Sequence, residues 1–255
     1  MKIFAARGWC RHLSSVKKSG PRTIGSILSA RVEKDFRSDA LISCHQGIRL
    51  NFGRLYSAAL AFASGLKRQN YRPGDKIAML LKNCAENVIV QLGSSFLGVA
   101  VVTAKDAASL VTLASQLSCK GAVSDVACGK DASFAGAFNS PIIITGDCRD
   151  VKVSHVPFDE FLKSPMSVVG QAKGFDSSAP AAFYGARSAV TQRDLIQAAE
   201  AAQNHLQLAS SDRLCLTITL NHSFGLGSGA AASTSVVHNA GARPVFPRPS
   251  ACVCL

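Results

Sequence analysis

Short apolar segments alternate with amphipathic segments along most of the chain, and this alternation restricts the fold more than any other feature of the sequence. The apolar segments predict buried strands at residues 49–52, 76–81, 99–103, 121–123, 141–145, 181–184, 214–220 and 243–246. Apolar residues at helical spacing predict helices at residues 55–69, 83–97, 107–117, 191–208 and 224–239. Residues 128–140 and 163–179 are expected to form surface loops. Strands separated by helices favour β-α-β units, so we expect an α/β fold with a mostly parallel sheet flanked by helices.

The positive charge of the chain is concentrated at its amino end. Seven of the 28 lysine and arginine residues lie within residues 1–32, which contain no acid, so the rest of the chain carries 21 basic and 16 acidic side chains. Serines and apolar residues, among them Trp9 and Leu13, lie between these charges, as in a mitochondrial transit peptide. We therefore expect a removable import segment and a location in the mitochondrial matrix. The alternative is a basic disordered tail that binds RNA or lipid.

The cysteines and the apolar content argue against several classes of protein. The nine cysteines include no C-x-x-C pair and no histidine at zinc-ligand spacing, which disfavours a zinc site or a secreted disulfide framework. No apolar run approaches the roughly 18–20 residues that a membrane-spanning helix needs. The last four residues, from Cys252 to Leu255, fit a C-a-a-X prenylation box, but prenylation belongs to cytosolic proteins and conflicts with import. We therefore expect no metal, no transmembrane segment and no prenylation at Cys252.

Residues 39–125 contain a series of short motifs in a fixed order. These motifs are the segments Leu50–Leu55, Ala63–Leu66, Tyr71–Ala78, Leu81–Asn83 and Phe96–Val102. Their order and spacing resemble the amino-terminal region of the acyl-CoA synthetases in the adenylate-forming, or AMP-binding, superfamily. The resemblance implies that the chain folds like the first part of the large amino-terminal domain of these enzymes.

A second block, residues 181–246, continues the resemblance. Thr191–Leu195 is similar to the T-H-R-N-L segment of the family, which opens the helix after its phosphate-binding loop. Asn221–Leu226 resembles the F-H-x-x-G segment that lies beside the acyl and adenylate pocket. The resemblance implies a vestigial substrate pocket formed by His222, Phe224 and Gly225. The alternative for His222 is a histidine whose hydrogen bonds are satisfied at the end of a strand.

The sequence departs from the family where the ATP phosphates should be held. The family has a Ser/Thr/Gly-rich loop ending in Pro-Lys-Gly, whose N–H groups, hydroxyls and lysine bind the phosphates. Here only residues 185–190 separate Tyr184 from Thr191. We therefore expect a degenerate phosphate loop, without catalytic residues, formed by Tyr184, Gly185, Arg187, Ser188 and Thr191. Arg187 could contact a single phosphate, although an exposed arginine in a turn is favoured.

Three hypotheses about function follow. The first is a pseudoenzyme that lacks the phosphate loop and the carboxyl-terminal domain, binds no cofactor, and serves as a structural or binding subunit of a mitochondrial assembly. The second is a truncated or split carboxylate– or fatty acid–CoA ligase, which would use ATP, Mg²⁺ and CoA. The third is a mitochondrial RNA-associated protein. We favour the first, with residues 1–32 as the import segment, 33–247 as a truncated synthetase-like region whose sheet a partner covers, and 248–255 as a tail.

Overall fold

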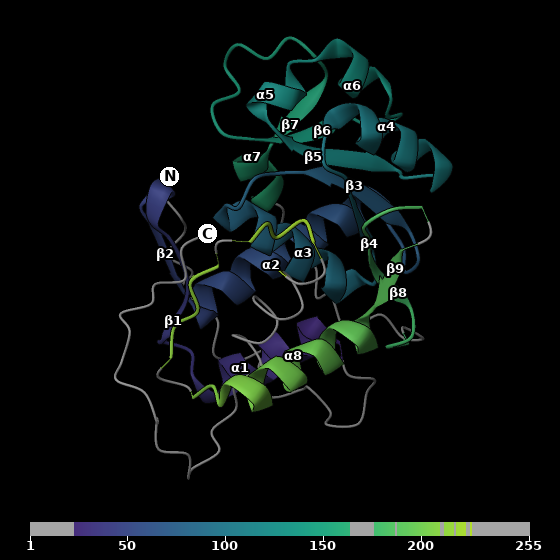
Figure 1. Cartoon of the computed structure of the whole chain (residues 1–255). Helices are drawn as coiled ribbons and strands as arrows, with labels where there is room; N and C mark the ends of the chain where they lie inside the picture. The colour runs from purple at the N-terminus through teal and green to yellow at the C-terminus, as the bar shows by residue number, and fades with distance from the viewer. Residues whose placement is uncertain are drawn as a thin grey trace.

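The computed structural model describes residues 23–163, 176–186, 188–209, 212–216, 218–222 and 225. Within these residues a seven-stranded sheet has the order β7-β6-β5-β3-β4-β8-β9, with helices on both of its faces (Figure 1). The neighbouring strands from β7 to β8 pair in parallel, and β9 pairs antiparallel with β8. This arrangement confirms the expected α/β fold with a mostly parallel sheet flanked by helices.

The inner strands of this sheet form where the apolar segments predicted them. Their bounds are β3 Lys76–Leu80, β4 Ala100–Thr103, β5 Gly121–Asp125, β6 Ile142–Thr145 and β8 Pro180–Phe183. All residues of β4 and β6 are buried, because helices cover both faces of a parallel sheet. The sequence patterns missed the two edge strands, β7 at His155–Pro157 and β9 at Ala189–Thr191.

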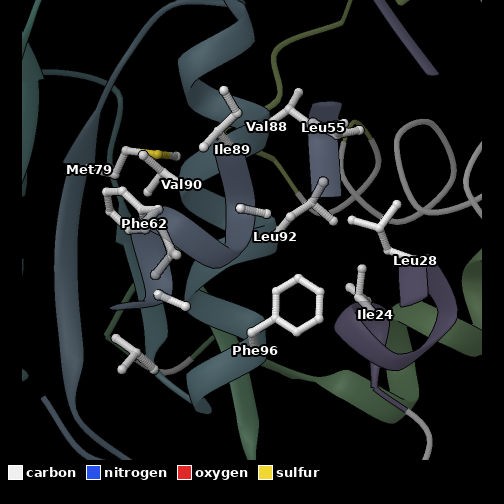
Figure 2. Packing of buried hydrophobic residues seen from close by; sticks show 14 of the residues in the cluster. Ile24, Leu28, Leu55, Phe62, Met79, Val88, Ile89, Val90, Leu92 and Phe96 are labelled. Atoms are coloured by element: carbon white, nitrogen blue, oxygen red, sulfur yellow. The ribbon is translucent and has the colours of Figure 1, made fainter. Parts of the chain in front are cut away.

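The helices divide into two layers, each with its own apolar core. One layer contains α1 Ile24–Lys34, α2 Phe52–Arg68, α3 Ala85–Leu97, α7 Phe158–Leu162 and α8 Gln192–Leu206. The opposite layer contains α4 Ala107–Gln116, α5 Val126–Gly129 and α6 Ala132–Gly136. Figure 2 shows the first core, where Phe62 of α2 lies near Met79 of β3 and Phe96 of α3 lies near Ile24 of α1. α3 is therefore enclosed on several sides.

The helix α1 was not predicted, and it is built into the first core. Thr23 caps its first turn, and Ile24 and Leu28 are buried. The backbone N–H of Ile24 donates to Oε1 of Gln192 in α8 at 3.1 Å, and that of Gly25 donates to Oγ of Ser95 in α3 at 3.1 Å. The expected boundary between residues 32 and 33 therefore falls inside α1, which is part of the folded region.

Two local expectations differ from the structure. Residues 128–140, expected to be a surface loop, contain the end of α5 and all of α6, and Phe134 of α6 is buried in the second core. The described residues of the expected strand at 214–220 form no strand, because side chains rather than a strand ladder bind their backbone. The expected helix at 224–239 lies outside the described residues except for Gly225, and the expected strand at 243–246 lies outside them entirely.

A second, two-stranded sheet lies apart from the main one. It consists of β1 at Asp39–Ser43 and β2 at Ile48–Asn51, which pair antiparallel and contact α2. The short 3₁₀ helix η3 at Cys44–Gln46 connects the two strands. Among the described residues, none of the helices combines the length and the hydropathy that a membrane crossing requires.

Candidate functional site

The candidate site lies at the carboxyl ends of β4 and β8, which are neighbouring parallel strands. Val102 of β4 lies opposite Phe183 of β8 in the register, so Thr103 and Tyr184 follow at the same edge of the sheet. Ligands of open α/β sheets bind at this edge, because the loops that follow the strands gather there. The structure therefore brings the expected phosphate-loop residues to the edge where an α/β protein would hold a ligand.

The segment expected to be a degenerate phosphate loop is a tight hairpin between β8 and β9. The backbone N–H of Tyr184 donates to the carbonyl of Ser188 at 3.2 Å, and the N–H of Ser188 donates to the carbonyl of Gly185 at 3.2 Å. Two of the donors that could have faced a phosphate are thus used within the hairpin. Arg187, the basic residue expected in this loop, lies outside the described residues.

The amino end of α8, which follows the hairpin, is also closed by the chain itself. The N–H of Gln192 donates to the carbonyl of Ala179 at 3.3 Å, and the N–H of Arg193 donates to the carbonyl of Ser177 at 2.9 Å. The N–H of Asp194 donates to Oγ1 of Thr191 at 3.1 Å. A helix amino terminus binds anions through such free N–H groups, and here these groups already have acceptors.

A capping box places a carboxylate at the same point. Oδ2 of Asp194 accepts from the backbone N–H of Thr191 at 2.9 Å and from its hydroxyl at 2.7 Å. The bond from the backbone N–H holds the pKa of the Asp194 carboxyl below its usual range. Asp194 therefore stays ionised at neutral pH, and its charge repels a phosphate from this helix end.

Tyr184 and His222 come from separate segments and meet at the end of β8. Their ring centroids are 5.9 Å apart and their planes are inclined by 38°. His222 is exposed, whereas the hydroxyl of Tyr184 is buried and has no hydrogen-bond partner among the described residues. Burial raises the pKa of the Tyr184 hydroxyl above its ordinary value, so this group stays protonated. The expected histidine at a strand end is not seen, since 218–222 form no strand.

Gly225 packs tightly against the segment that carries His222. A Cβ atom at Gly225 would lie 2.2 Å from the carbonyl oxygen of Thr219, so any other residue would force this backbone apart. Phe224, the third residue expected in the vestigial pocket, lies outside the described residues. The structure thus groups His222 and Gly225 with Tyr184.

The sequence analysis missed a cluster of buried and half-buried side-chain amides next to His222. It consists of Asn83, Asn87, Gln91 and Asn221, which we call the amide cluster. The first three recur every fourth residue, just before α3 and along it, where most neighbouring residues are apolar. Amides at this spacing within an apolar helix are the sequence signal that could have revealed the cluster. Among the described residues, no three His, Cys, Asp or Glu side chains gather as metal ligands would.

Removing the unpaired hydroxyl of Tyr184 should stabilise the chain. A buried polar group without a partner costs about 1–3 kcal/mol, so Tyr184→Phe is expected to raise the free energy of unfolding by about 1 kcal/mol. Urea unfolding followed by circular dichroism measures the change. Tyr56→Phe, which removes a hydroxyl from a half-buried ring, is the control and should not raise the free energy of unfolding. A loss of stability in Tyr184→Phe would show that the hydroxyl has a partner.

Comparison with known sequences gives a family match to part of the chain. The family model for "AMP-binding enzyme" matches residues 28–142, which confirms the expected resemblance over that part. Two curated relatives, both described as "Medium-chain acyl-CoA ligase ACSF2, mitochondrial", come from Rattus norvegicus and Mus musculus. Each is 32% identical to this chain, over 105 and 104 residues respectively. Both alignments cover 40% of this chain and 17% of the relative, so they span a small part of those proteins.

Solved structures extend the likeness to most of the chain. MbtA from Mycobacterium smegmatis has a TM-score of 0.73 at 20% identity, over 85% of this chain and 43% of that protein. The anthranilate CoA ligase AuaEII, solved with anthranoyl-AMP, has a TM-score of 0.75 at 17% identity, over 85% of this chain and 44% of that protein. A benzoate CoA ligase from Burkholderia xenovorans has a TM-score of 0.72 at 20% identity, over 84% and 44%. At these identities the likeness shows a shared fold.

Proposed function

We propose that this chain is an acyl-CoA-synthetase-like protein that does not form acyl-adenylates and that serves as a binding or structural subunit in mitochondria. The hydrogen-bonded hairpin between Tyr184 and Thr191 carries the proposal. Adenylation requires donors and charges that are preorganised around the phosphates of ATP. In this hairpin the N–H groups of Tyr184 and Ser188 bind backbone carbonyls instead.

The surroundings of the hairpin also fit a triphosphate poorly. The first N–H groups of α8 bind the carbonyls of Ala179 and Ser177 and the hydroxyl of Thr191. Asp194 adds a negative charge at the same helix end. The residues present therefore do not match ATP with its magnesium ion, and this mismatch lies inside the chain, where it does not depend on how far the protein extends.

The mitochondrial part of the proposal rests on the basic composition of residues 1–32 and on the residue at which the folded region begins. Six of the seven basic residues of the acid-free segment precede α1, and the related ligases are described as mitochondrial. Because Thr23 and Ile24 belong to the folded region, we propose that an import segment ends before Thr23. A matrix location follows from this type of segment, because it directs import across both membranes.

The subunit part of the proposal is supported by apolar side chains at the surface. Leu206 at the end of α8 is 57% exposed and Ile218, four residues before His222, is 42% exposed. Contiguous exposed apolar surface marks contacts with other proteins, and Ile218 lies on the segment that carries His222. We propose a protein partner at the surface around Ile218.

Pyrophosphate exchange tests whether the chain activates a carboxylate. The purified protein would be incubated with ATP, Mg²⁺, labelled pyrophosphate and fatty acids of medium chain length, beside the rat ACSF2 ligase as the positive control. We expect no exchange above a blank without protein, because the hairpin offers no phosphate cradle. His222→Ala is the matched variant, since it removes a residue of the site and thereby separates exchange by this chain from that of a contaminating ligase. Saturable exchange that His222→Ala lowers would support the truncated or split ligase instead.

Cross-linking in a mitochondrial extract tests the subunit part. The protein should cross-link to a distinct partner and elute from a sizing column ahead of its monomer. Elution as a free monomer, with no cross-linked product, would contradict this part and leave the expectation about adenylation standing.

A further inference from the structure

We propose that Asn87 and Gln91 of α3 are positioning residues that, together with Asn221, hold the segment 218–222 and set His222 against Tyr184. This inference rests on the hydrogen bonds that join α3 to the segment 218–222. Its consequence for a ligand at His222 rests on the proposed function, which takes this edge of the sheet as the binding site.

Asn87 lies at the centre of the cluster and uses both ends of its amide. Its Nδ2 shares its two hydrogens among three acceptors, the carbonyls of Leu81 and Lys82, at 3.3 and 3.2 Å, and Oδ1 of Asn221 at 3.0 Å. Its Oδ1 accepts from Nε2 of Gln91 at 2.5 Å. Asn87 is fully buried, so each of these bonds replaces one to water. The side chain therefore joins the end of β3, α3 and the segment 218–222.

Asn221 anchors the segment from its own side. Its Nδ2 donates to the carbonyl of Leu81 at 2.7 Å, and its backbone carbonyl accepts from Oγ1 of Thr103 at 3.0 Å. Asn221 is therefore tied to the carboxyl ends of two adjacent strands, β3 and β4. Because His222 is the next residue, the position of its Cα follows from these bonds.

The residues before Asn221 are held by the same helix. Nε2 of Gln91 donates to the carbonyl of Leu220 at 3.2 Å, and Leu220 is itself buried in the first core. Oδ1 of Asn83 accepts from the N–H of Leu220 at 2.8 Å, while its Nδ2 donates to the carbonyl of Ile218 at 2.7 Å. Asn83, just before α3, and Gln91 of α3 thus supply the backbone of 218–220 with the partners that a neighbouring strand would otherwise provide.

Hydrogen bonds that only fixed the start of α3 would not need to reach the segment 218–222. Another amide near the start of α3, that of the half-buried Gln46, shows the contrast. Its Oε1 accepts from the N–H of Ala85 at 2.8 Å and its Nε2 donates to Glu86 at 2.8 Å, and both bonds fix the start of the helix. Neither bond reaches residues 218–222. Gln46 therefore offers a matched variant that removes comparable hydrogen bonds without releasing His222.

The test is an NMR measurement on the whole chain without any ligand. Cross-relaxation between the Tyr184 and His222 rings, assigned with Tyr184→Phe and His222→Gln, reports their proximity. In Asn221→Ala and Asn87→Leu we expect this signal to be lost, because the segment no longer has its anchors. In Gln46→Ala we expect the signal to persist. Circular dichroism of each variant shows whether it is folded.

Each outcome decides the question. A retained signal in folded Asn221→Ala overturns the proposal, as does an equal loss in folded Gln46→Ala, because the effect would then be a general loosening. If Asn87→Leu does not fold, Asn221→Ala decides, since Asn221 is only half-buried and lies on the segment itself. Because the measurement uses no ATP and no fatty acid, its failure is separate from a failure of the proposed function.

Discussion

Phe62→Ala is expected to lower the free energy of unfolding by about 3–5 kcal/mol, the range for deleting a fully buried aromatic side chain. Phe62 of α2 is completely buried between the main sheet and the outer helices (Figure 2). Its ring stacks on Phe158 at a centroid distance of 5.9 Å and contacts Phe161 at 5.1 Å. Truncation would leave a cavity where α2, α7 and the sheet meet, and the rigid surroundings could only partly fill it.

Urea unfolding followed by circular dichroism measures this loss, with Phe36→Ala as the control. Phe36 is 44% exposed, so its truncation should cost less than about 1 kcal/mol. Subtracting the loss of free energy in Phe36→Ala from that in Phe62→Ala cancels the effect that deleting an aromatic ring has on the unfolded chain. Similar losses in both variants would mean that Phe62 does not occupy the centre of the first core.

The inner part of the fold could be predicted because its residues follow simple periodicities. β3, α3 and β4 are consecutive, and the continuous apolar runs of the two strands are those of strands covered on both faces. α1 was missed because the basic composition of residues 1–32 suggested a single import segment. The burial of Ile24 and Leu28 depends on α3 and α8, which lie far along the chain. Such long-range contacts override local composition.

The candidate site could be predicted only in part. The flanks Tyr184 and Thr191 were expected at a degenerate loop, and they form the ends of the hairpin. That the hairpin uses its own donors could not be deduced, since hydrogen bonds between backbone groups are independent of side-chain identity. The pairing of Tyr184 with His222 depends on 218–222 being held as coil, whereas the apolar run 214–220 suggested a strand.

The amide cluster links the architecture of α3 to the site. α3 is almost wholly buried, and its polar residues Asn87 and Gln91 bind the segment 218–222, which forms no strand. A buried amide lowers the stability of the fold when it lacks hydrogen-bond partners. When it is fully paired, it stabilises one particular arrangement of the chain. Under the proposed function, this pairing would keep the surface around His222 intact without any bound phosphate.

The position of α3 depends on a close contact with α2 at Gly93. A Cβ atom there would lie 2.7 Å from the carbonyl oxygen of Ala59 and 2.9 Å from Cβ of Phe62. Neither backbone can yield without separating the two helices, so Gly93→Ala is expected to lower the free energy of unfolding by about 2–3 kcal/mol through overpacking. The sign is opposite to helix propensity, which favours alanine over glycine by about 1 kcal/mol.

Gly136→Ala in α6 is the matched control for this prediction, measured by the same urea unfolding. A Cβ at Gly136 would meet nothing within 4 Å, so alanine should raise the free energy of unfolding by about 0.4–1 kcal/mol by restricting the unfolded chain. Gain of stability in both variants would contradict the close contact at Gly93. Since Gln91 and Asn87 lie on the same helix, folded Gly93→Ala protein should also show a weaker Tyr184–His222 signal, whereas Gly136→Ala should leave it unchanged. Packing between α2 and α3 thereby determines where the amide cluster lies and, through it, the geometry of the site.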